Sequence, residues 1–267
     1  MQVWTVVNQK GGVGKTTTVV SLAGLLVQQG KRVLMIDTDP QGSLGYYLGL
    51  DPEELPRSLY DLFYHHQAIS TKLCQSVIVP TKVERLHLMP ASSALATLDR
   101  SLGNKPGMGF VLSRVIESLK CRYDAIIIDC PPVLGVLMIN ALACCQHVIV
   151  PVQTEYLALK GLGRMVGTLE RMGKSGKAIP PYTIVPTMFD RRTKASLLAL
   201  SELARSYPER LWHSVIPVDT RLRDASLAHL PGPQFAGRSR GINAYNELLE
   251  GLLERGQNDG KHRPASG

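Results

Sequence analysis

The cysteines of this chain lack the arrangements that build metal sites or disulfide frameworks. Five are present, an odd number: Cys74, Cys121, Cys130, Cys144 and Cys145. No Cys-x-x-Cys pair occurs, which argues against a zinc site. No secretory signal precedes the first apolar run, so an extracellular disulfide-bonded protein is not expected. These absences favour a reduced, cytosolic protein.

Long uninterrupted apolar runs are also lacking. The longest candidate, residues 125–152, is broken by Asp129, Pro131, Pro132 and Asn140. A spanning helix needs about 20 consecutive apolar residues, so this stretch is better explained as strand, helix and strand of a buried sheet. No long linker and no internal repeat divide the chain. We therefore predict one domain over residues 1–255, followed by a polar, disordered tail at 256–267.

Acidic residues are fewer than basic ones. The chain has 22 Asp and Glu against 30 Lys and Arg, and its formal net charge is +8. This balance favours contact with polyanions such as nucleic acid or an acidic membrane surface. Surplus surface lysine and arginine that only keep the protein soluble would give the same total, so the positions of the arginines must decide.

What the chain does contain is a regular alternation of strand-like and helix-like segments. Short apolar runs predict strands at residues 3–7, 33–36, 86–89, 125–128, 148–152, 182–186 and 215–216. Helical spacing predicts helices between most of them, one of them at 93–101, and a last helix over about 243–254. The alternation predicts an α/β fold: a single doubly wound, mostly parallel sheet with helices on both faces. Ligands of such folds bind at the carboxyl ends of the strands.

A glycine-rich loop follows the first predicted strand and opens a helix. Its residues are Gly11, Gly12, Val13, Gly14, Lys15, Thr16 and Thr17. The glycines leave backbone N–H groups open to phosphate, Lys15 should reach the β- and γ-phosphates, and Thr16 should place its hydroxyl on Mg²⁺. The strict phosphate-loop pattern has glycine where this chain has Gln9, and no Gly-x-Gly-x-x-Gly fingerprint occurs at this turn. The context of strand and helix nevertheless predicts a phosphate site.

A second lysine, Lys10, lies at the mouth of this loop. Lys15 alone is enough to hold a triphosphate within one chain. We therefore expect Lys10 to touch the nucleotide bound to another copy, which would make the protein a nucleotide-controlled dimer.

Carboxylates end two of the predicted buried strands. Asp129 follows the strongest apolar run and can hold magnesium through a water. Asp37 and Asp39 follow the second strand, within residues 37–42. We expect Asp37 near the magnesium shell and Asp39 to orient the water that attacks the γ-phosphate. The structural alternatives are a helix cap at Asp129 and a Pro-containing turn at Asp39.

Three motifs resemble the deviant Walker ATPases of the ParA/MinD family: residues 10–17, 37–42 and 129–132. Looser similarity continues to residue 255. The resemblance implies ATP and Mg²⁺ as ligands, a dimer around two sandwiched ATP molecules, and slow hydrolysis that a partner stimulates. It also implies that Lys10 acts across the dimer, and it places Met188 and Pro217 at the adenine.

Within that family the chain most resembles the ParC branch, which positions chemotaxis signalling arrays at the cell pole. The similarity lies in residues 1–4, 190–193, 218–226 and 239–245. It implies an array adaptor as protein partner. The alternative is partitioning of a plasmid or chromosome with a ParB-like protein. The expected location is the cytoplasm, at the pole or on the nucleoid.

Arginines of the second half lie where ParA proteins bind DNA without sequence preference. The candidates are Arg192, Arg221, Arg223 and Arg240. Such contacts would be directed at phosphates and would depend strongly on salt. Solubility, or adenine and dimer contacts from the same loops, are alternative roles. No helix-turn-helix extension precedes the first strand, so a reader of specific DNA sequence is not expected.

The last predicted helix argues against membrane insertion. Its polar face is acidic, with Glu247, Glu250 and Glu254. A helix that lies on a membrane surface should be basic, so packing onto the domain is the better explanation.

Three other classes of protein share such a loop. An iron–sulfur reductase of the nitrogenase-iron-protein type shares Lys10 but needs two cysteines per chain at the dimer axis, which Cys130, Cys144 and Cys145 do not clearly supply. An ATP-dependent ligase or amidase needs a second-substrate pocket, and no extra acid–base cluster is visible. Asp39 argues against a scaffold without turnover. We therefore predict a weak, partner-stimulated ATPase that positions cellular cargo.

Overall fold

The computed structural model describes residues 1–98, 107–174 and 180–261. These residues form one seven-stranded sheet with the order β3-β4-β2-β5-β1-β6-β7. The strands are β1 Gln2–Val6, β2 Val33–Asp37, β3 Val79–Pro80, β4 Leu86–Met89, β5 Ala125–Asp129, β6 His147–Gln153 and β7 Tyr182–Thr187. Neighbouring strands run parallel, except that β3 pairs antiparallel with β4 at the edge. The predicted α/β sheet is confirmed.

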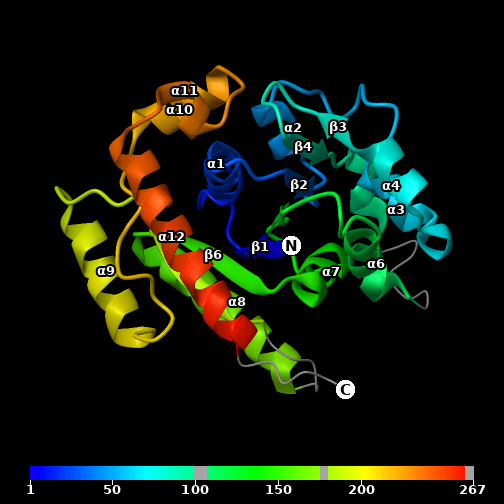
Figure 1. Cartoon of the computed structure of the whole chain (residues 1–267). Helices are drawn as coiled ribbons and strands as arrows, with labels where there is room; N and C mark the ends of the chain where they lie inside the picture. Colours follow the sequence, from blue (N-terminus) through cyan, green and yellow to red (C-terminus); the bar gives the residue numbers. More distant parts are fainter. Residues whose placement is uncertain (99–106, 175–179, 262–267) are drawn as a thin grey trace.

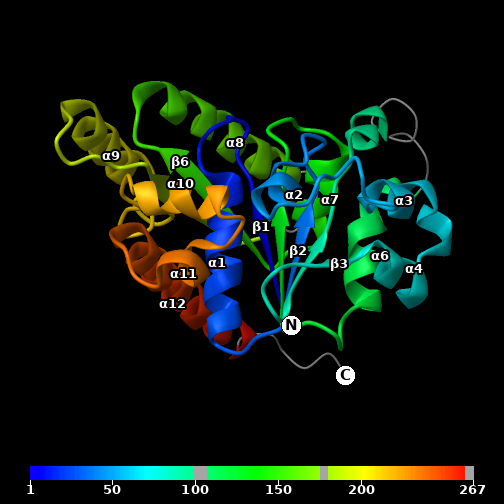
Figure 2. The ribbon, with the colours of Figure 1, turned by 90° about the horizontal axis from the view of Figure 1, so that it is seen from above.

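Helices cover both faces of the sheet (Figures 1 and 2). The α-helices are α1 Lys15–Gln28, α2 Ser43–Tyr47, α3 Leu59–Tyr64, α4 Thr71–Val77, α6 Val111–Ser118, α7 Val136–Cys144, α8 Tyr156–Lys174, α9 Lys194–Ser206, α10 Thr220–Leu227, α11 Gly232–Ala236 and α12 Arg240–Lys261. Short 3₁₀ turns occupy His66–Ala68, Ser93–Thr97 and Met108–Phe110. None of the helices in the described part of the chain is long and apolar enough to cross a bilayer.

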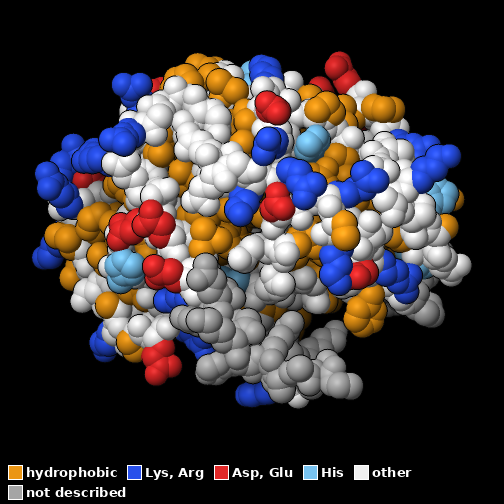
Figure 3. Space-filling view, in the orientation of Figure 1, with side chains coloured by type: hydrophobic (Ala, Val, Ile, Leu, Met, Phe, Trp, Pro, Cys, Tyr) orange, Lys and Arg blue, Asp and Glu red, His pale blue; other side chains and the backbone are white. Residues whose placement is uncertain are grey.

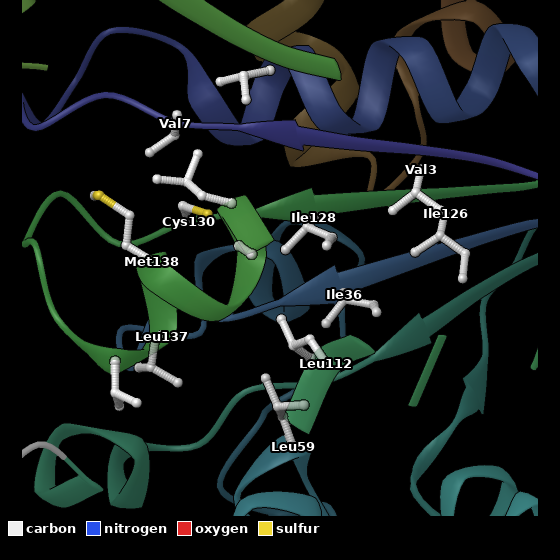
Figure 4. Close-up of a cluster of buried hydrophobic side chains, with 14 of the residues drawn as sticks. Val3, Val7, Ile36, Leu59, Leu112, Ile126, Ile128, Cys130, Leu137 and Met138 are labelled. Carbon is white, nitrogen blue, oxygen red and sulfur yellow. The ribbon is translucent and has the colours of Figure 1, made fainter. Parts of the chain in front are cut away.

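The central strand β5 shows why the sheet needs two helical layers. Successive side chains of a strand point to opposite faces. Ile126 and Ile128 pack into the core under α3, α6, α7 and α8, whereas Ala125 and Ile127 pack under α1 and α12. Figure 4 shows Ile126 and Ile128 among the side chains of the first of these cores. Each fully buried isoleucine stabilises the fold by about 1.5–3 kcal/mol, so both faces must be covered.

Two of the predicted elements are corrected. The strand expected at 215–216 does not form. Ile216 instead bonds to the backbone of Pro186 and Phe189 in a loop pair, because the following Pro217 has no N–H for a ladder. The expected helix at 93–101 is a 3₁₀ turn at Ser93–Thr97, and residues 99–106 lie outside the described part.

The last helix is longer than predicted. α12 begins at Arg240 and continues to Lys261, so the first six residues of the segment expected to be disordered, 256–261, have helical backbone. Residues 262–267 lie outside the described part of the chain. Residues 256–261 contain Gly256 and Gly260 but no proline, and glycine weakens a helix without removing a backbone donor as proline does.

Candidate nucleotide-binding site

The strand order brings the sequence motifs to one point of the sheet. β5 lies between β1 and β2, and its last residue, Asp129, is in register with Val6 on one side and Asp37 on the other. The glycine-rich loop leaves β1 directly after Val6. Since all three strands are parallel, the loop and both carboxylates share one edge, at the switch in strand order where α/β sheets bind ligands.

The glycines of the loop adopt a backbone conformation that other residues rarely take. Gly12 has φ 74° and Gly14 has φ 87°, in the left-handed region. Gly14 also precedes the first residue of α1, and no side chain caps this helix. The N–H groups of its first turn are therefore available to an anion, which the helix dipole also favours.

Two neighbouring segments hold the loop in shape. The Thr187 hydroxyl donates to the Val13 carbonyl over 2.9 Å. Asn8, fully buried at the end of β1, accepts from the Lys10 N–H at 3.1 Å and donates to the Pro151 carbonyl at 2.8 Å. The sequence analysis did not include Asn8. A polar residue that follows an apolar strand and precedes a glycine-rich loop was the available signal.

The two lysines of the loop have different surroundings. Lys15 is 8% exposed, and its ammonium group donates to the Lys10 carbonyl over 3.2 Å. The Lys10 ammonium group forms an ion pair with Glu155, two residues beyond β6. The stem of Lys10 lies against Gly161 of α8, where an added Cβ would be 3.2 Å from the Lys10 Cβ. Lys15 is thus buried against the backbone of its own loop, whereas Lys10 is held by a side chain beyond β6.

Asp129 and Thr16 form the first part of a cation site. The Thr16 hydroxyl donates to Asp129 Oδ2 over 2.6 Å. Asp129 Oδ1 is buried and has no hydrogen-bond partner among the described residues. Burial raises the pKa of Asp129 to about 7, against the opposing effects of the Thr16 hydrogen bond and the Lys15 charge. Asp129 does not cap α7, whose N-cap is Gly135, so the structural alternative for it is excluded.

Asp37 lies beside Asp129 and is also fully buried. Its oxygens accept from the Asp39 N–H at 3.0 Å and the Leu44 N–H at 3.1 Å. Burial raises its pKa well above the ordinary value, and the neighbouring charge of Asp129 adds to this. Two buried carboxylates repel each other because their charges have the same sign, and a hard cation relieves this repulsion.

These oxygens fit Mg²⁺ in particular. Magnesium binds through one or two carboxylates and completes its shell with phosphate oxygens and waters. Within the described residues, no group of three or more His, Cys, Asp or Glu is placed to enclose a metal by itself. The donor set of Thr16, Asp129 and Asp37 therefore suits a cation that arrives with a phosphate ligand.

Asp39 is half-buried and close to this pair. Its Oδ1 accepts from the Gln41 N–H at 3.0 Å, and its carbonyl accepts from the Gly42 N–H at 2.9 Å. The turn foreseen as a structural role for Asp39 is therefore present. Its charge also raises the pKa values of both Asp37 and Asp129, so the three carboxylates lie near one another.

A cavity of about 350 Å³ lies between Gly14 of the glycine-rich loop, the loop after β7 and the loop before α10. Its lining includes Thr17, Met188 and Pro217. The Met188 side chain reaches to 4.0 Å from the position of a Cβ on Gly14. Two long-range backbone bonds, Phe189 N–H to the Ile216 carbonyl and Val218 N–H to the Phe189 carbonyl, join the two loops. The structure thus brings Met188 and Pro217 together beside the phosphate loop.

The cavity also contains residues that the sequence analysis missed or placed elsewhere. Tyr47, Asp219 and Tyr245 belong to its walls, and so does Arg223. Arg223, one of the arginines predicted to bind DNA, is exposed and is also among the lining residues of this cavity. No short motif marks these positions, because they come from α2, α10 and α12 and meet only in the folded chain.

The other predicted DNA-binding arginines gather near the starts of α9, α10 and α12. Arg192, 82% exposed, pairs with Asp190 at 2.7 Å. This pair holds the pKa of Asp190 down to about 2, and the charge of Arg240 acts in the same direction. The Asp219 carboxylate joins the neighbouring helices by accepting from the N–H groups of Arg221 and Gly241. Figure 3 shows Lys and Arg side chains along this edge of the molecule.

Comparison with known proteins places the chain in a family. The AAA domain family matches residues 1–179. The sporulation initiation inhibitor protein Soj of Bacillus subtilis is 36% identical over 252 residues, which cover 94% of this chain and 98% of Soj. The chromosome partitioning protein ParA of Myxococcus xanthus is 32% identical over 249 residues, with coverages of 93% and 86%. The chain belongs to the ParA/Soj family of P-loop ATPases.

A solved structure extends this similarity to a bound ligand. The ParA/Soj-family chain resembles a Mycobacterium smegmatis protein described as cobyrinic acid a,c-diamide synthase, solved with ADP and magnesium. The two are 34% identical, with a TM-score of 0.79 and coverages of 96% of this chain and 95% of the other.

Proposed function

We propose that this ParA/Soj-family protein is an ATP-dependent dimerisation switch that hydrolyses ATP slowly. The observation that carries the proposal is the geometry around Asp129. A buried carboxylate with one free oxygen receives the Thr16 hydroxyl, next to the uncapped start of α1. The bound ADP and magnesium of the Mycobacterium smegmatis relative support the same pair of ligands here.

Each part of the site has a role in this proposal. The loop N–H groups and Lys15 hold the phosphates, while Thr16, Asp37 and Asp129 hold Mg²⁺. The cation would neutralise charge that develops on the phosphate oxygens. Asp39 orients the attacking water.

Lys10 gives the switch its dependence on a second copy. To reach a partner's phosphates, Lys10 has to leave Glu155. Large apolar side chains are exposed close to this pair: Tyr156 and Leu157 at the start of α8 are each 68% exposed. An apolar surface beside the phosphate loop supports burial of this region in a dimer.

Dimerisation can be tested by light scattering with and without Mg·ATP. Wild type is expected to form dimers only with ATP, and Lys15→Gln to stay monomeric. Lys120→Gln, a change of an exposed lysine two residues beyond the end of α6, serves as the matched control. A Lys15→Gln protein that still dimerises on ATP would refute the loop assignment.

Two cargoes fit such a switch. The named relatives support partitioning of DNA with a ParB-like protein, and the exposed Arg192, Arg221 and Arg240 supply a surface for non-specific DNA. The similarity of residues 190–193 and 218–226 to the ParC branch supports polar positioning of chemotaxis arrays. A pull-down with Asp39→Ala protein and ATP separates them: array proteins are expected in one case, a ParB-like protein in the other.

An ATP-dependent amidase is a second candidate, favoured by one observation. A groove of about 640 Å³ lies beside Gln9 at the loop, with Lys160, Arg164 and Arg171 among its lining residues. Cations at that point would suit a polycarboxylate whose acid group is activated by ATP. ATP consumption that rises with such an acid and ammonia would support this candidate, and unchanged consumption would remove it.

A further inference from the structure

The ion pair between Lys10 and Glu155 joins the mouth of the glycine-rich loop to the start of α8. The two residues are 145 positions apart in the chain. They meet because β1 and β6 are neighbouring parallel strands, with Val6 in register with Ile149. The side chains of Lys10 and Glu155 are 27% and 42% exposed, so solvent screens the pair only in part.

The backbone of Lys10 is held in place, whereas its side chain can rotate. The Lys10 N–H donates to Asn8 Oδ1 at 3.1 Å, and the Lys10 carbonyl accepts from the Lys15 ammonium group at 3.2 Å. The stem lies along Gly161 of α8, where an added Cβ would be 3.2 Å from Lys10 Cβ and 3.8 Å from Lys10 Cδ. Rotation of the stem away from α8 would therefore take the ammonium group off Glu155 without moving the loop.

Glu155 itself is fixed at the start of α8. Its carbonyl accepts from the Ala158 N–H at 3.1 Å, so it lies at the N-terminal end of the helix, where the helix dipole favours a carboxylate. The preceding Thr154 N–H is bonded to the Thr187 carbonyl at 3.1 Å. The acid therefore stays in place when the Lys10 side chain moves.

A phosphate that approached Lys10 in this position would also approach the Glu155 carboxylate. Like charges at short range repel, and a terminal phosphate carries up to about two negative charges near neutral pH. Tyr156 and Leu157, directly after Glu155, are each 68% exposed, so a second copy that covered them would also bury the ion pair. Burial of an intact ion pair often costs more than its attraction returns. Glu155 thus opposes a second copy as long as it holds Lys10.

We propose that Glu155 is a positioning residue that holds Lys10 on its own chain and thereby raises the protein concentration needed for the ATP-bound dimer. The inference rests on the proposed function, since it requires Lys10 to act across the dimer. Lys10 then has two alternative anions: the Glu155 carboxylate in the single copy and a phosphate of the partner in the dimer. Each anion stabilises only the state in which it binds Lys10, so the ion pair sets the balance between the two states.

Analytical ultracentrifugation of wild type and Glu155→Gln with Mg²⁺ and a non-hydrolysable ATP analogue tests this role. Glu155→Gln should lower the dimer dissociation constant by about 2- to 30-fold, because two ion pairs open per dimer and each exposed pair accounts for a factor of about 1.4 to 5. A purely structural role of Glu155 would predict a weaker dimer instead.

Two controls accompany this measurement. Glu170→Gln removes the same charge from an exposed position of α8 and should dimerise like wild type. Binding of Mg·ADP to the single copy, measured by calorimetry, should be equal in wild type, Glu155→Gln and Glu170→Gln, because the phosphate loop is unchanged in all three.

Three results would overturn the inference. An unchanged dissociation constant for Glu155→Gln would mean that the ion pair does not restrain Lys10, and a higher one would mean that Glu155 supports the dimer. Equal tightening in Glu170→Gln would assign the effect to total charge.

A second variant decides if Glu155→Gln does not fold. Gly161→Ala adds a methyl group against the Lys10 stem and changes no charge. A tighter dimer of Gly161→Ala supports the inference, and an equal or weaker one overturns it. Failure of every protein, wild type included, to dimerise with the analogue contradicts the proposed function instead.

Discussion

The phosphate end and the base end of the proposed nucleotide site are built in different ways. The phosphate end consists of one continuous loop and two carboxylates on neighbouring strands, all of them held by the backbone of a parallel sheet. The base end consists of loops and helices from residues 47, 188, 217–223 and 245, held together by single long-range bonds. The comparison teaches that pairing within the sheet positions the charged groups, whereas the proposed base end depends on segments that meet only through long-range bonds and helix packing.

The largest expected effect comes from the phosphate end. Asp39→Ala should lower ATP hydrolysis by about 10²–10⁴-fold, the range for loss of a positioned acid–base group, and should leave ATP binding intact. Phosphate release and calorimetry measure the two quantities. Asp51→Ala, an exposed aspartate in the next turn, is the control. Unchanged hydrolysis in Asp39→Ala would remove the water-orienting role.

Asp129→Asn should have opposite effects on metal binding and on the stability of the folded protein. The substitution should weaken Mg²⁺-dependent ATP binding by about 10–100-fold, as loss of an outer-shell metal partner does. It should also stabilise the nucleotide-free protein, because a buried charge is removed. Each kcal/mol gained raises Tm by about 2–4 °C in a chain of this size. A lower Tm for Asp129→Asn would contradict the account of Asp129 as an unrelieved buried acid.

Asp129 should also make the stability of the nucleotide-free protein depend on pH. The folded-state pKa of Asp129, about 7, lies above that of an unfolded aspartate, so the folded state binds the proton more tightly. The stabilisation that comes from this tighter proton binding is fully present below the unfolded pKa, about 4, and is lost as pH rises through about 7. Nucleotide-free wild type should therefore melt at a higher temperature at pH 5.5 than at pH 8, and this difference should shrink in Asp129→Asn.

The exposed arginines near the starts of α9 and α10 allow a test of DNA binding. Removing two phosphate contacts, Arg192→Ala with Arg221→Ala, should reduce the slope of log affinity for DNA against log salt by about 2. Lys31→Ala with Arg32→Ala removes the same charge directly before β2, at the amino ends of the strands, and should leave the slope unchanged. Equal slopes for both double variants would mean that Arg192 and Arg221 act on DNA only through the total charge of the protein.

The smallest effect should come from a single bond of the base end. Asp219→Ala removes the cap of α10 and the bond to the start of α12, which should cost about 0.5–2 kcal/mol of stability. Asp224→Ala, an exposed aspartate on the same helix, should cost less. Thermal unfolding measures both. Equal losses would mean that the base end does not depend on this connection.

The phosphate end could be predicted because its signals are local. Asp37 and Asp129 each end a short apolar run, and parallel pairing of those runs places the two acids side by side. Much of the base end could not be predicted. Tyr47 ends the short helix α2, Asp219 caps α10 and Arg223 lies within α10, and both helices contain few buried residues that would mark a pattern. The expected strand at 215–216 was wrong for a related reason: two apolar residues before a proline do not specify a ladder.

The sequence by itself determined the glycine-rich loop, the apolar strands and the acids that end them, because backbone conformation and burial pattern are specified over a few residues. Only the tertiary structure decided that Lys10 pairs with Glu155, that Arg223 joins the cavity and that the Tyr47 hydroxyl has no protein partner. Long side chains find their contacts on segments far away in the chain. Which segments those are depends on strand order and helix packing, which no local pattern contains.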